Sequence, residues 1–196
     1  MNTLKIISGE YKNRGINTPG GATHPMGERE RNALFNMIID KIKGAVVMDL
    51  YAGSGALGIE AISRGAKKIL FVEENHVAMR TIVQNCTSLG IPEEKVAFYR
   101  GSASAFYKKF TNPSAVALDP MMAANFAGFP KEYDIILADP PYDNPDYKVI
   151  NCFIKLLNDD GVLVLSHPDE APDFPGMAIL NTHKYAAARI SIYAKN

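Results

Sequence analysis

The residues best suited to chemistry in this sequence follow a short apolar segment, Tyr133–Ala138. Next comes the tetrad Asp-Pro-Pro-Tyr at 139–142. The Asp139 carboxylate and the Pro140 carbonyl can both accept hydrogen bonds from an exocyclic NH₂ group, and such bonds strengthen as the nitrogen becomes positive. Consecutive prolines restrict the backbone and hold these acceptors in place, and Tyr142 offers a ring on which a planar base can stack. The tetrad therefore indicates a holder for an aromatic amine; the alternative is a rigid turn that only ends a strand.

Three glycines follow another apolar segment, residues 45–50, at the spacing Gly-x-Gly-x-x-Gly: Gly53, Gly55 and Gly58. Glycine lets the chain turn sharply and lets a ligand approach the backbone closely, and the N-terminus of the following helix favours negative charge. The spacing is typical of nucleotide-binding turns between a strand and a helix. It also fits a tight turn without a ligand, so the glycines alone do not identify a nucleotide site.

Two acidic residues near this turn narrow the range of ligands. Asp49 precedes the first glycine on the same segment, where a carboxylate is a poor neighbour for a pyrophosphate but a good partner for an ammonium group. Glu73 follows the apolar segment 68–72, and an acid at the end of the second strand can accept hydrogen bonds from both ribose hydroxyls. A nucleoside that carries an amino acid suits both acids, and S-adenosylmethionine is such a molecule.

Alternating strands and helices must position these residues. From residue 45 onward the pattern repeats strand and helix, which predicts a parallel sheet with helices on both faces. The ligand crevice of such a sheet lies outside the carboxyl ends of its strands, so we expect the Asp139 corner beside the glycine turn. Residues 177–196 indicate two final strands that can pair antiparallel. The expected strands are 45–50, 68–72, 95–100, 133–138 and 162–166, and the expected helices run from the glycine turn to Gly65, from Asn75 to about residue 89, over 102–110 and over 147–157.

The N-terminal residues predict a small hairpin that precedes the α/β region. Residues 4–8 and 14–17 flank a turn and are typical of a hairpin, and a loop rich in glycine and proline follows. An amphipathic helix then begins at Glu28 and ends at Gly44.

Length and composition favour one folded domain. The chain has 196 residues, of which 47% are apolar and 21% are charged, enough for one sizeable core. We predict an N-terminal extension at 1–27 and an α/β domain at 28–196. Residues 111–132 are apolar but broken by prolines, so we expect a loop there with one helical turn around 121–125.

Charge and cysteine usage also limit the possible functions. The 21 Lys and Arg residues balance the 21 Asp and Glu residues, so any polyanion must meet a local basic patch. Cys86 and Cys152 lack the spacing of a metal site, which predicts a reduced protein without a metal. No segment has the apolar length of a signal peptide or a membrane span, so we expect a soluble, cytoplasmic protein.

At these motifs the chain resembles the class I, Rossmann-like S-adenosylmethionine-dependent methyltransferases, and among them the RsmD type. That type methylates the exocyclic N2 of a guanine in 16S ribosomal RNA. The resemblance implies a seven-stranded, mostly parallel sheet with helices on both faces and a small N-terminal hairpin. It is carried by the segments KIISGEYKNRGINTP, THPMGERERNALFNMI, DLYAGSGALGIEAISRGA, FVEENHVAMRTIVQNCTSLGI and DPPY.

The resemblance also assigns roles to individual residues. The family usually has an aspartate after its third strand, where this chain has Ser102, and commonly has Thr-Arg-Pro before its first helix, where this chain has Thr23-His24-Pro25. The implied catalytic residues are Asp139, Pro140 and Tyr142; the implied cofactor-binding residues are Asp49, Tyr51, Gly53, Gly55, Glu73, Ser102, Ala103 and Asp139; and the implied substrate-binding residues are Arg14, His24, Arg29, Arg31, Pro141 and Tyr142.

The implied cofactor is S-adenosylmethionine, and the implied partner is 16S ribosomal RNA or the assembling small subunit, bound by a monomer. Three alternatives remain open from the residues. The first is an adenine-N6 methyltransferase of DNA, because the Asp-Pro-Pro-Tyr tetrad also occurs in that class. The second is a nicotinamide dehydrogenase, which the glycine spacing allows. The third is an RNA-binding module without activity. For the RsmD-type interpretation, the residues leave open which guanine is modified.

Overall fold

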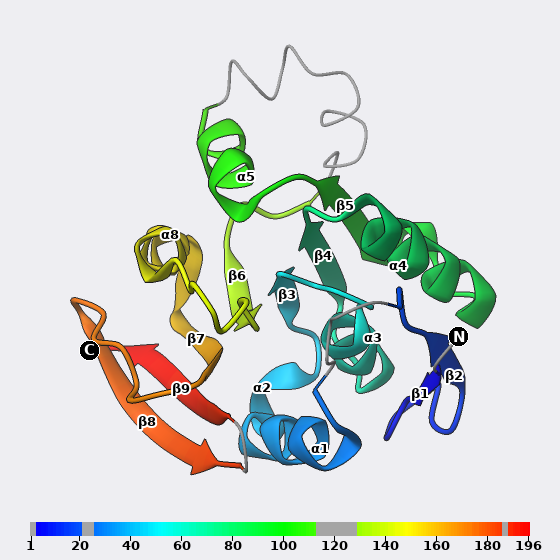
Figure 1. Ribbon diagram of the computed structural model, residues 1–196, viewed down its shortest axis with the longest axis horizontal. Helices are drawn as coiled ribbons and strands as arrows, with labels where there is room; N and C mark the ends of the chain where they lie inside the picture. Colours follow the sequence, from blue (N-terminus) through cyan, green and yellow to red (C-terminus); the bar gives the residue numbers. More distant parts are fainter. Residues whose placement is uncertain (1–2, 21–25, 113–128, 186–187) are drawn as a thin grey trace.

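A seven-stranded sheet forms the centre of the chain (Figure 1). The computed structural model describes residues 3–20, 26–112, 129–185 and 188–196. The strand order is β5-β4-β3-β6-β7-β9-β8, in which the pairs from β5 to β7 run parallel and β9 runs antiparallel to β7 and β8. The mostly parallel sheet that the sequence predicts is confirmed. Its strands are β3 (Val46–Leu50), β4 (Lys68–Glu73), β5 (Val96–Arg100), β6 (Tyr133–Ala138), β7 (Leu157–His167), β8 (Met177–Lys184) and β9 (Arg189–Lys195).

The central strands are apolar on both faces because both faces are covered. On β4, the side chains of Ile69 and Phe71 belong to one core, whereas those of Leu70 and Val72 belong to the other. Parallel strands buried on both sides have continuous apolar runs rather than an alternation of apolar and polar residues. These runs are what made the strands visible in the sequence.

Strand β7 begins earlier than the sequence predicts. It includes the polar residues 158–160, whereas the apolar pattern starts only at Val162. A cross-strand contact supports this polar stretch, because the Asn158 side chain donates a hydrogen bond to Asp134 Oδ1 on β6 at 2.6 Å. Strand formation here depends on tertiary contacts that local propensity does not reveal.

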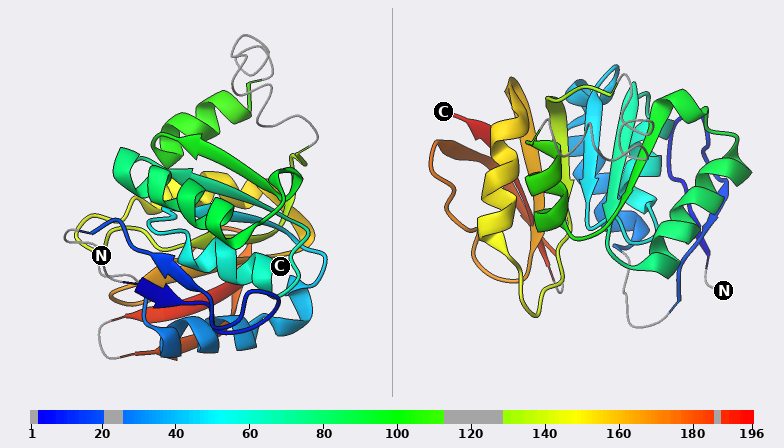
Figure 2. Two further views of the ribbon diagram at one scale, coloured as in Figure 1. Left: turned by 90° about the vertical axis from the view of Figure 1, so that its right-hand side faces the viewer. Right: turned by 90° about the horizontal axis from the view of Figure 1, so that it is seen from above.

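Helices lie on both faces of the sheet (Figure 2). Helices α1 to α4 contribute to one core, and α5 and α8 contribute to the other. The Asn75 side chain caps α4, as predicted, and Gly90 ends it in a left-handed conformation. The single helix expected from Glu28 to Gly44 is divided at Ile38, whose φ of −119° interrupts the helix. The helices are α1 (Glu28–Met37), α2 (Ile39–Ile42), α3 (Ala56–Ser63), α4 (His76–Leu89), α5 (Ala103–Phe110) and α8 (Tyr147–Phe153), with 3₁₀ turns η1 (Glu93–Lys95) and η2 (Ile154–Leu156).

Strands β1 (Thr3–Lys5) and β2 (Gly15–Asn17) form the antiparallel hairpin that the sequence predicts. Its buried side chains Ile6, Tyr11 and Ile16 join the core beneath α1 and α3. This hairpin and the C-terminal pair β8–β9 lie at opposite ends of the molecule (Figure 2). The division into residues 1–27 and 28–196 remains a prediction, and the helical turn expected around 121–125 lies outside the described residues.

Two further features concern the described ranges alone. Within them, no helix is both long enough and apolar enough to pass through a bilayer. The same ranges contain no group of three or more His, Cys, Asp or Glu side chains arranged to hold a metal ion. Cys86 and Cys152 are both free thiols.

Candidate active site

The strand order puts a topological switch point, where open α/β sheets have their ligand crevice, between β3 and β6. The chain continues from β3 to β4 and β5 in one direction, and β6 then lies on the other side of β3. Loops that leave the sheet at such a switch point diverge, and ligands of open α/β sheets bind between them. The register pairs Leu50 with Ala138, so the glycine turn and Asp139 leave adjacent strands at the same edge. The two motifs therefore lie side by side, as the sequence predicts.

The turn after β3 has a backbone that few residues tolerate. Gly53 and Gly55 have φ angles of +57° and +77°, and Gly55 immediately precedes α3. Gly58 has no room for a side chain, because a Cβ atom there would overlap the ring of Phe71. Tyr51 has a φ of +62°, a conformation that non-glycine residues adopt where surrounding structure enforces it, commonly at functional sites. The sequence pattern revealed the glycines but not the strained Tyr51.

Asp49 lies against the glycine turn and is almost fully buried. Its Oδ2 accepts a hydrogen bond from the Gly58 backbone N–H at 2.9 Å, and the residue is 1% exposed. Burial, with smaller contributions from the Asp139 and Glu73 carboxylates, raises the pKa of Asp49 to about 8. The Asp139 and Glu73 carboxylates thus act on Asp49 at this edge, and a bound cation would favour the ionised form of Asp49.

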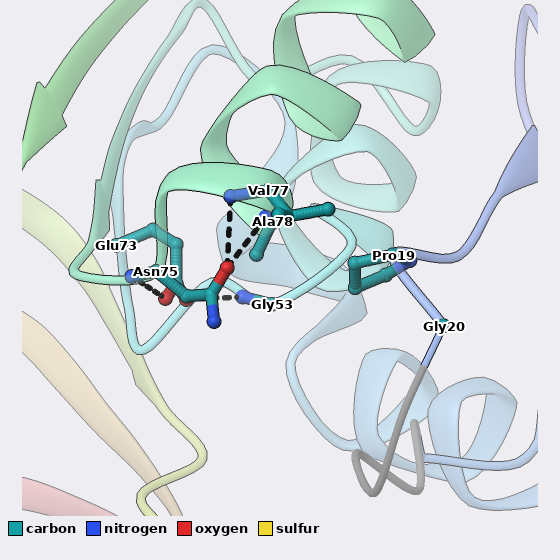
Figure 3. A pocket seen from close by; sticks show the side chains of 7 residues that line it. All are labelled: Pro19, Gly20, Gly53, Glu73, Asn75, Val77 and Ala78. Atoms are coloured by element: carbon teal, nitrogen blue, oxygen red, sulfur yellow. Dashed lines mark hydrogen bonds between the residues drawn. The ribbon is translucent and has the colours of Figure 1, made fainter.

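Glu73 connects the end of β4 to the glycine turn. Its Oε2 accepts a hydrogen bond from the Gly53 backbone N–H at 2.8 Å, and its Oε1 accepts one from Asn75 N–H at 2.7 Å. A carboxylate has about four acceptor positions, so both oxygens can still accept bonds from a ligand. Figure 3 shows Glu73 and Gly53 joined in this way at a cavity of about 340 Å³. The cavity is lined by Pro19, Gly20, Gly53, Glu73, Asn75, Val77 and Ala78.

The Asp139 corner lies on the other side of β3. Asp139 is half-buried; burial raises the pKa of its carboxyl, and a hydrogen bond with the Ser166 side chain lowers it. Pro140 is buried and Pro141 is exposed. The ring of Tyr142 is 37% exposed, and its hydroxyl lies 2.5 Å from Ser166 Oγ. The corner thus presents a carboxylate and a partly exposed ring at the crevice.

Ser102 and Ala103 follow β5, one strand beyond Glu73. Glu73 pairs with Arg100, so the two residues leave the sheet at the same edge as the acids. Ser102 Oγ accepts a hydrogen bond from the Ala105 backbone N–H at 3.2 Å and caps α5. A hydroxyl oxygen has a second lone pair, so capping does not prevent it from accepting another bond.

Comparison with known proteins agrees with this geometry. The family described as "Conserved hypothetical protein 95" matches residues 4–194. The chain belongs to this family, the RsmD family.

YlbH of Bacillus subtilis, provisionally named an rRNA methyltransferase, is a relative of this RsmD-family chain. It is 29% identical over 98% of the chain and 99% of its own length. Ribosomal RNA small subunit methyltransferase D of Haemophilus influenzae is 32% identical over 63% of the chain and 66% of its own length. The solved structure of the Escherichia coli protein yhhF, provisionally titled a methyltransferase, has a TM-score of 0.82 with 22% identity over 100% and 99% of the two chains. That structural likeness shows that the methyltransferase fold is shared.

The residues that the RsmD resemblance assigned to RNA lie in different environments. Arg14 is exposed, with Nη2 donating to the Ser88 carbonyl at 2.9 Å, and Arg29 is exposed in the first turn of α1. Arg31 is 1% exposed, so its guanidinium packs inside the protein instead of facing solvent. It donates to the carbonyls of Lys5 at 2.7 Å and Met26 at 2.9 Å. His24 lies outside the described residues.

Two buried polar side chains that the sequence analysis missed hold the N-terminal hairpin to the RsmD-family fold. Glu60 on α3 accepts hydrogen bonds from the backbone N–H groups of Ile7 at 2.8 Å and Ser8 at 3.0 Å. Asn85 on α4 exchanges two 2.9 Å hydrogen bonds with the Asn17 backbone. Its Nδ2 also donates to the Ser54 carbonyl in the glycine turn at 3.1 Å. Asn85 therefore links the exit of the hairpin to the turn beside the cavity.

Ser166 is the third residue that the sequence analysis missed, although a signal was present. It follows the apolar run of β7 at the carboxyl edge of the sheet, just as Asp139 follows β6. A polar residue at the end of a buried parallel strand is a candidate site residue wherever the crevice lies next to that strand. Glu60 and Asn85 gave no comparable signal, because polar residues within helices are common on solvated faces.

Proposed function

We propose that this protein transfers a methyl group from S-adenosylmethionine to the exocyclic N2 of a guanine in 16S ribosomal RNA. The observation that carries the proposal is the register between β3 and β6, which puts the glycine turn beside the Asp139 corner. The relative from Haemophilus influenzae, named a ribosomal RNA small subunit methyltransferase, supports the choice of RNA. The matching N-terminal segment supports RNA over DNA as well.

The residues at the edge of the sheet fit S-adenosylmethionine. Its ammonium and sulfonium charges suit an edge where the carboxylates of Glu73 and Asp139 act on Asp49. Glu73 borders the cavity and has free acceptor positions for ribose hydroxyls, and Gly53 leaves room for close approach of a ligand to the backbone. Ser102 and Ala103 are the residues that we assign to the adenine, and Tyr51 and Gly55 shape the turn around the amino-acid end.

The chain's own residues then hold the amine for direct displacement. When bound, the cofactor supplies an electrophilic methyl group on its sulfonium. The Asp139 carboxylate and the Pro140 carbonyl accept the two N–H bonds of the guanine amine, while the Tyr142 ring stacks on the base. As the N–C bond forms and the C–S bond breaks, the nitrogen becomes positive and both acceptors bind it more strongly. The Asp139 carboxylate accepts the proton that the methylated nitrogen releases.

The N-terminal extension, residues 1–27, is our proposed contact for the RNA. Arg14 and Arg29 are exposed and can meet phosphates, and we place His24 and Pro141 at the same interface. A guanine inside a duplex would have to leave its stack, which costs a few kcal/mol and less in a poorly paired loop. We therefore propose 16S RNA or the assembling small subunit as the partner of a cytoplasmic monomer.

A methyl-transfer assay tests the proposed function. Purified protein with isotopically labelled S-adenosylmethionine is incubated with immature small subunits, with protein-free 16S RNA and with duplex DNA, and nucleosides are identified by mass spectrometry. We expect labelled N2-methylguanosine in RNA, loss of at least about 100-fold in rate for Asp139→Ala, and wild-type rate for Asp143→Ala, an exposed carboxylate of the same loop. Labelled N6-methyladenine in DNA alone would make the acceptor wrong. Tight binding of NAD(H) without binding of S-adenosylhomocysteine would make the cofactor wrong.

A further inference from the structure

The buried hydroxyl of Ser166 lies beside both Asp139 and Tyr142, the two ends of the Asp-Pro-Pro-Tyr tetrad. Ser166 is 2% exposed and lies near the end of β7, the strand next to β6. The register pairs Leu165 with Ala138, so Ser166 stands level with Asp139. Its Oγ lies 2.5 Å from the Tyr142 hydroxyl, and the Ser166 hydroxyl lowers the pKa of the Asp139 carboxyl. A single side chain therefore stands beside both groups that would hold the base.

An ionised Asp139 would give the hydrogen bonds of this cluster one direction. An ionised carboxylate only accepts, so Ser166 is the group that can donate a hydroxyl proton to Asp139. In that arrangement Ser166 Oγ accepts from the Tyr142 hydroxyl, a direction that the 2.5 Å contact between the two oxygens allows. The result is a chain from Tyr142 through Ser166 to the Asp139 carboxylate. Hydrogen bonds in a chain polarise and strengthen one another, which suits the short Tyr142–Ser166 distance.

We propose that Ser166 is a positioning residue for methyl transfer, which fixes the Asp139 carboxylate and the Tyr142 ring relative to each other. The inference rests on the proposed function and adds to it a residue outside the Asp-Pro-Pro-Tyr tetrad. A ring that is 37% exposed gains its orientation from its anchored hydroxyl. A base stacked on Tyr142 then presents its amine to Asp139 in one geometry, and preorganised acceptors contribute most to the rate.

The carboxylate of Asp139 also depends on Ser166 for its charge. Burial raises the pKa of Asp139, and the Ser166 hydrogen bond acts in the opposite direction. The other titratable groups around the corner are Asp49 from β3, Tyr142 in the following loop and Tyr147 from α8, which acts on Tyr142. Since Asp49 carries the same sign of charge, its ionisation cannot replace the lost hydrogen bond. Removal of the Ser166 hydroxyl should therefore raise the pKa of Asp139.

Steady-state kinetics of Ser166→Ala test the inference, with Ser191→Ala as the matched control. Ser191 is a buried serine on neighbouring strand β9, and its hydroxyl bonds His167 Nε2 at 2.8 Å and Thr182 Oγ1 at 2.7 Å. For Ser166→Ala we expect kcat to fall about 10- to 100-fold, with affinity for S-adenosylhomocysteine unchanged. The acid limb of the kcat–pH profile should move to higher pH. Ser166→Thr keeps a hydroxyl and should restore most of kcat, and Ser191→Ala should change neither kcat nor the limb.

A carboxyl ¹³C NMR titration of Asp139 separates this inference from the proposed function, because it needs no substrate. A wild-type protein that methylates no RNA would overturn the proposed function, and the titration would still report on Ser166. Equal Asp139 pKa values and equal kcat in wild type and Ser166→Ala would show that the positioning role is wrong. Circular dichroism checks folding, and Ser166→Cys, close in volume but a weak donor, replaces Ser166→Ala in every comparison if that variant does not fold.

Discussion

Asp49, Glu73 and Asp139 lie at or next to the carboxyl ends of three neighbouring strands, but each carboxyl group has different surroundings. Asp49 accepts a hydrogen bond from the Gly58 backbone N–H and is buried, so its carboxyl group supports the glycine turn from inside the protein. Glu73 binds two backbone N–H groups and still borders the cavity. Asp139 is half-buried at the crevice, and the Ser166 hydroxyl lowers the pKa of its carboxyl. In our proposal the same residue type therefore shapes the turn in one place, binds a ribose in another and faces the amine in the third.

The buried Asp49 should make the stability of the ligand-free protein depend on pH. Its pKa of about 8 means that the folded state keeps a proton, which the unfolded chain releases near pH 4. Between these values the folded state binds more protons, so the free energy of unfolding falls as the pH rises, by about 1.4 kcal/mol per pH unit. Urea unfolding at several pH values measures this slope. Asp49→Asn cannot ionise and should lose this contribution; an unchanged slope would contradict the assignment.

Gly58 should tolerate no side chain. A Cβ atom at this position would overlap the Phe71 ring, so α3 would have to move away from β4. We expect Gly58→Ala to lower the free energy of unfolding by about 1–3 kcal/mol, the usual cost of overpacking a core. Gly15→Ala is the control, because nothing lies within 4 Å of a Cβ there. Equal urea midpoints for the two variants would contradict this prediction and would show that α3 and β4 can separate enough to accept a Cβ atom at little cost in stability.

At the scale of elements, the N-terminal hairpin is fastened to the helices rather than to the sheet. Glu60 on α3 and Asn85 on α4 bond its backbone, and the Glu60 carboxylate also forms a 2.7 Å ion pair with Arg64. The segment after β2 then reaches the cavity, which Pro19 and Gly20 help to line. Figure 3 shows this segment opposite Asn75 and Glu73. Asn85 therefore holds both the end of the hairpin, through Asn17, and the glycine turn beside the cavity, through Ser54.

Asn85→Ala should loosen the hairpin and weaken ligand binding together. The variant leaves the Asn17 N–H and carbonyl and the Ser54 carbonyl without their partner, a loss of about 2–3 kcal/mol in unfolding free energy. Hydrogen exchange of the β2 amides should accelerate, and the Kd for S-adenosylhomocysteine should rise about tenfold. Gln84→Ala, its exposed neighbour on α4, should change neither quantity. Faster exchange without weaker binding would show that the hairpin and cavity are independent.

Across the whole molecule, the sequence predicts the strands and the crevice because their signals are local. Apolar runs buried on both faces mark β3, β4 and β6, and the acids directly follow or end these runs. The hydrogen bonds that hold the N-terminal hairpin to the helices could not be predicted, since Glu60 and Ile7 are separated by 53 positions in the sequence. The role of Arg31 could not be predicted either. A basic residue near a motif indicates a contact with an RNA phosphate, whereas the folded protein buries Arg31, which donates to the Lys5 and Met26 carbonyls. The role of a polar side chain depends on partners that are distant in the sequence, and the local spacing of residues does not show which partners these are.

The contrast between Arg29 and Arg31 yields a prediction about the proposed RNA-binding surface. Both lie on α1, but Arg29 is exposed and Arg31 is 1% exposed. Arg29→Ala should weaken RNA binding and reduce the slope of log K against log salt by about one, with no change in stability. Arg31→Ala should instead lower the free energy of unfolding by about 2–4 kcal/mol, because two buried carbonyls lose their charged donor. RNA titrations at several salt concentrations, with urea unfolding of the same variants, separate the two effects. If Arg31→Ala stayed fully stable and lost RNA binding instead, its guanidinium would have to leave the interior to reach the RNA, and the N-terminal segment would rearrange on binding.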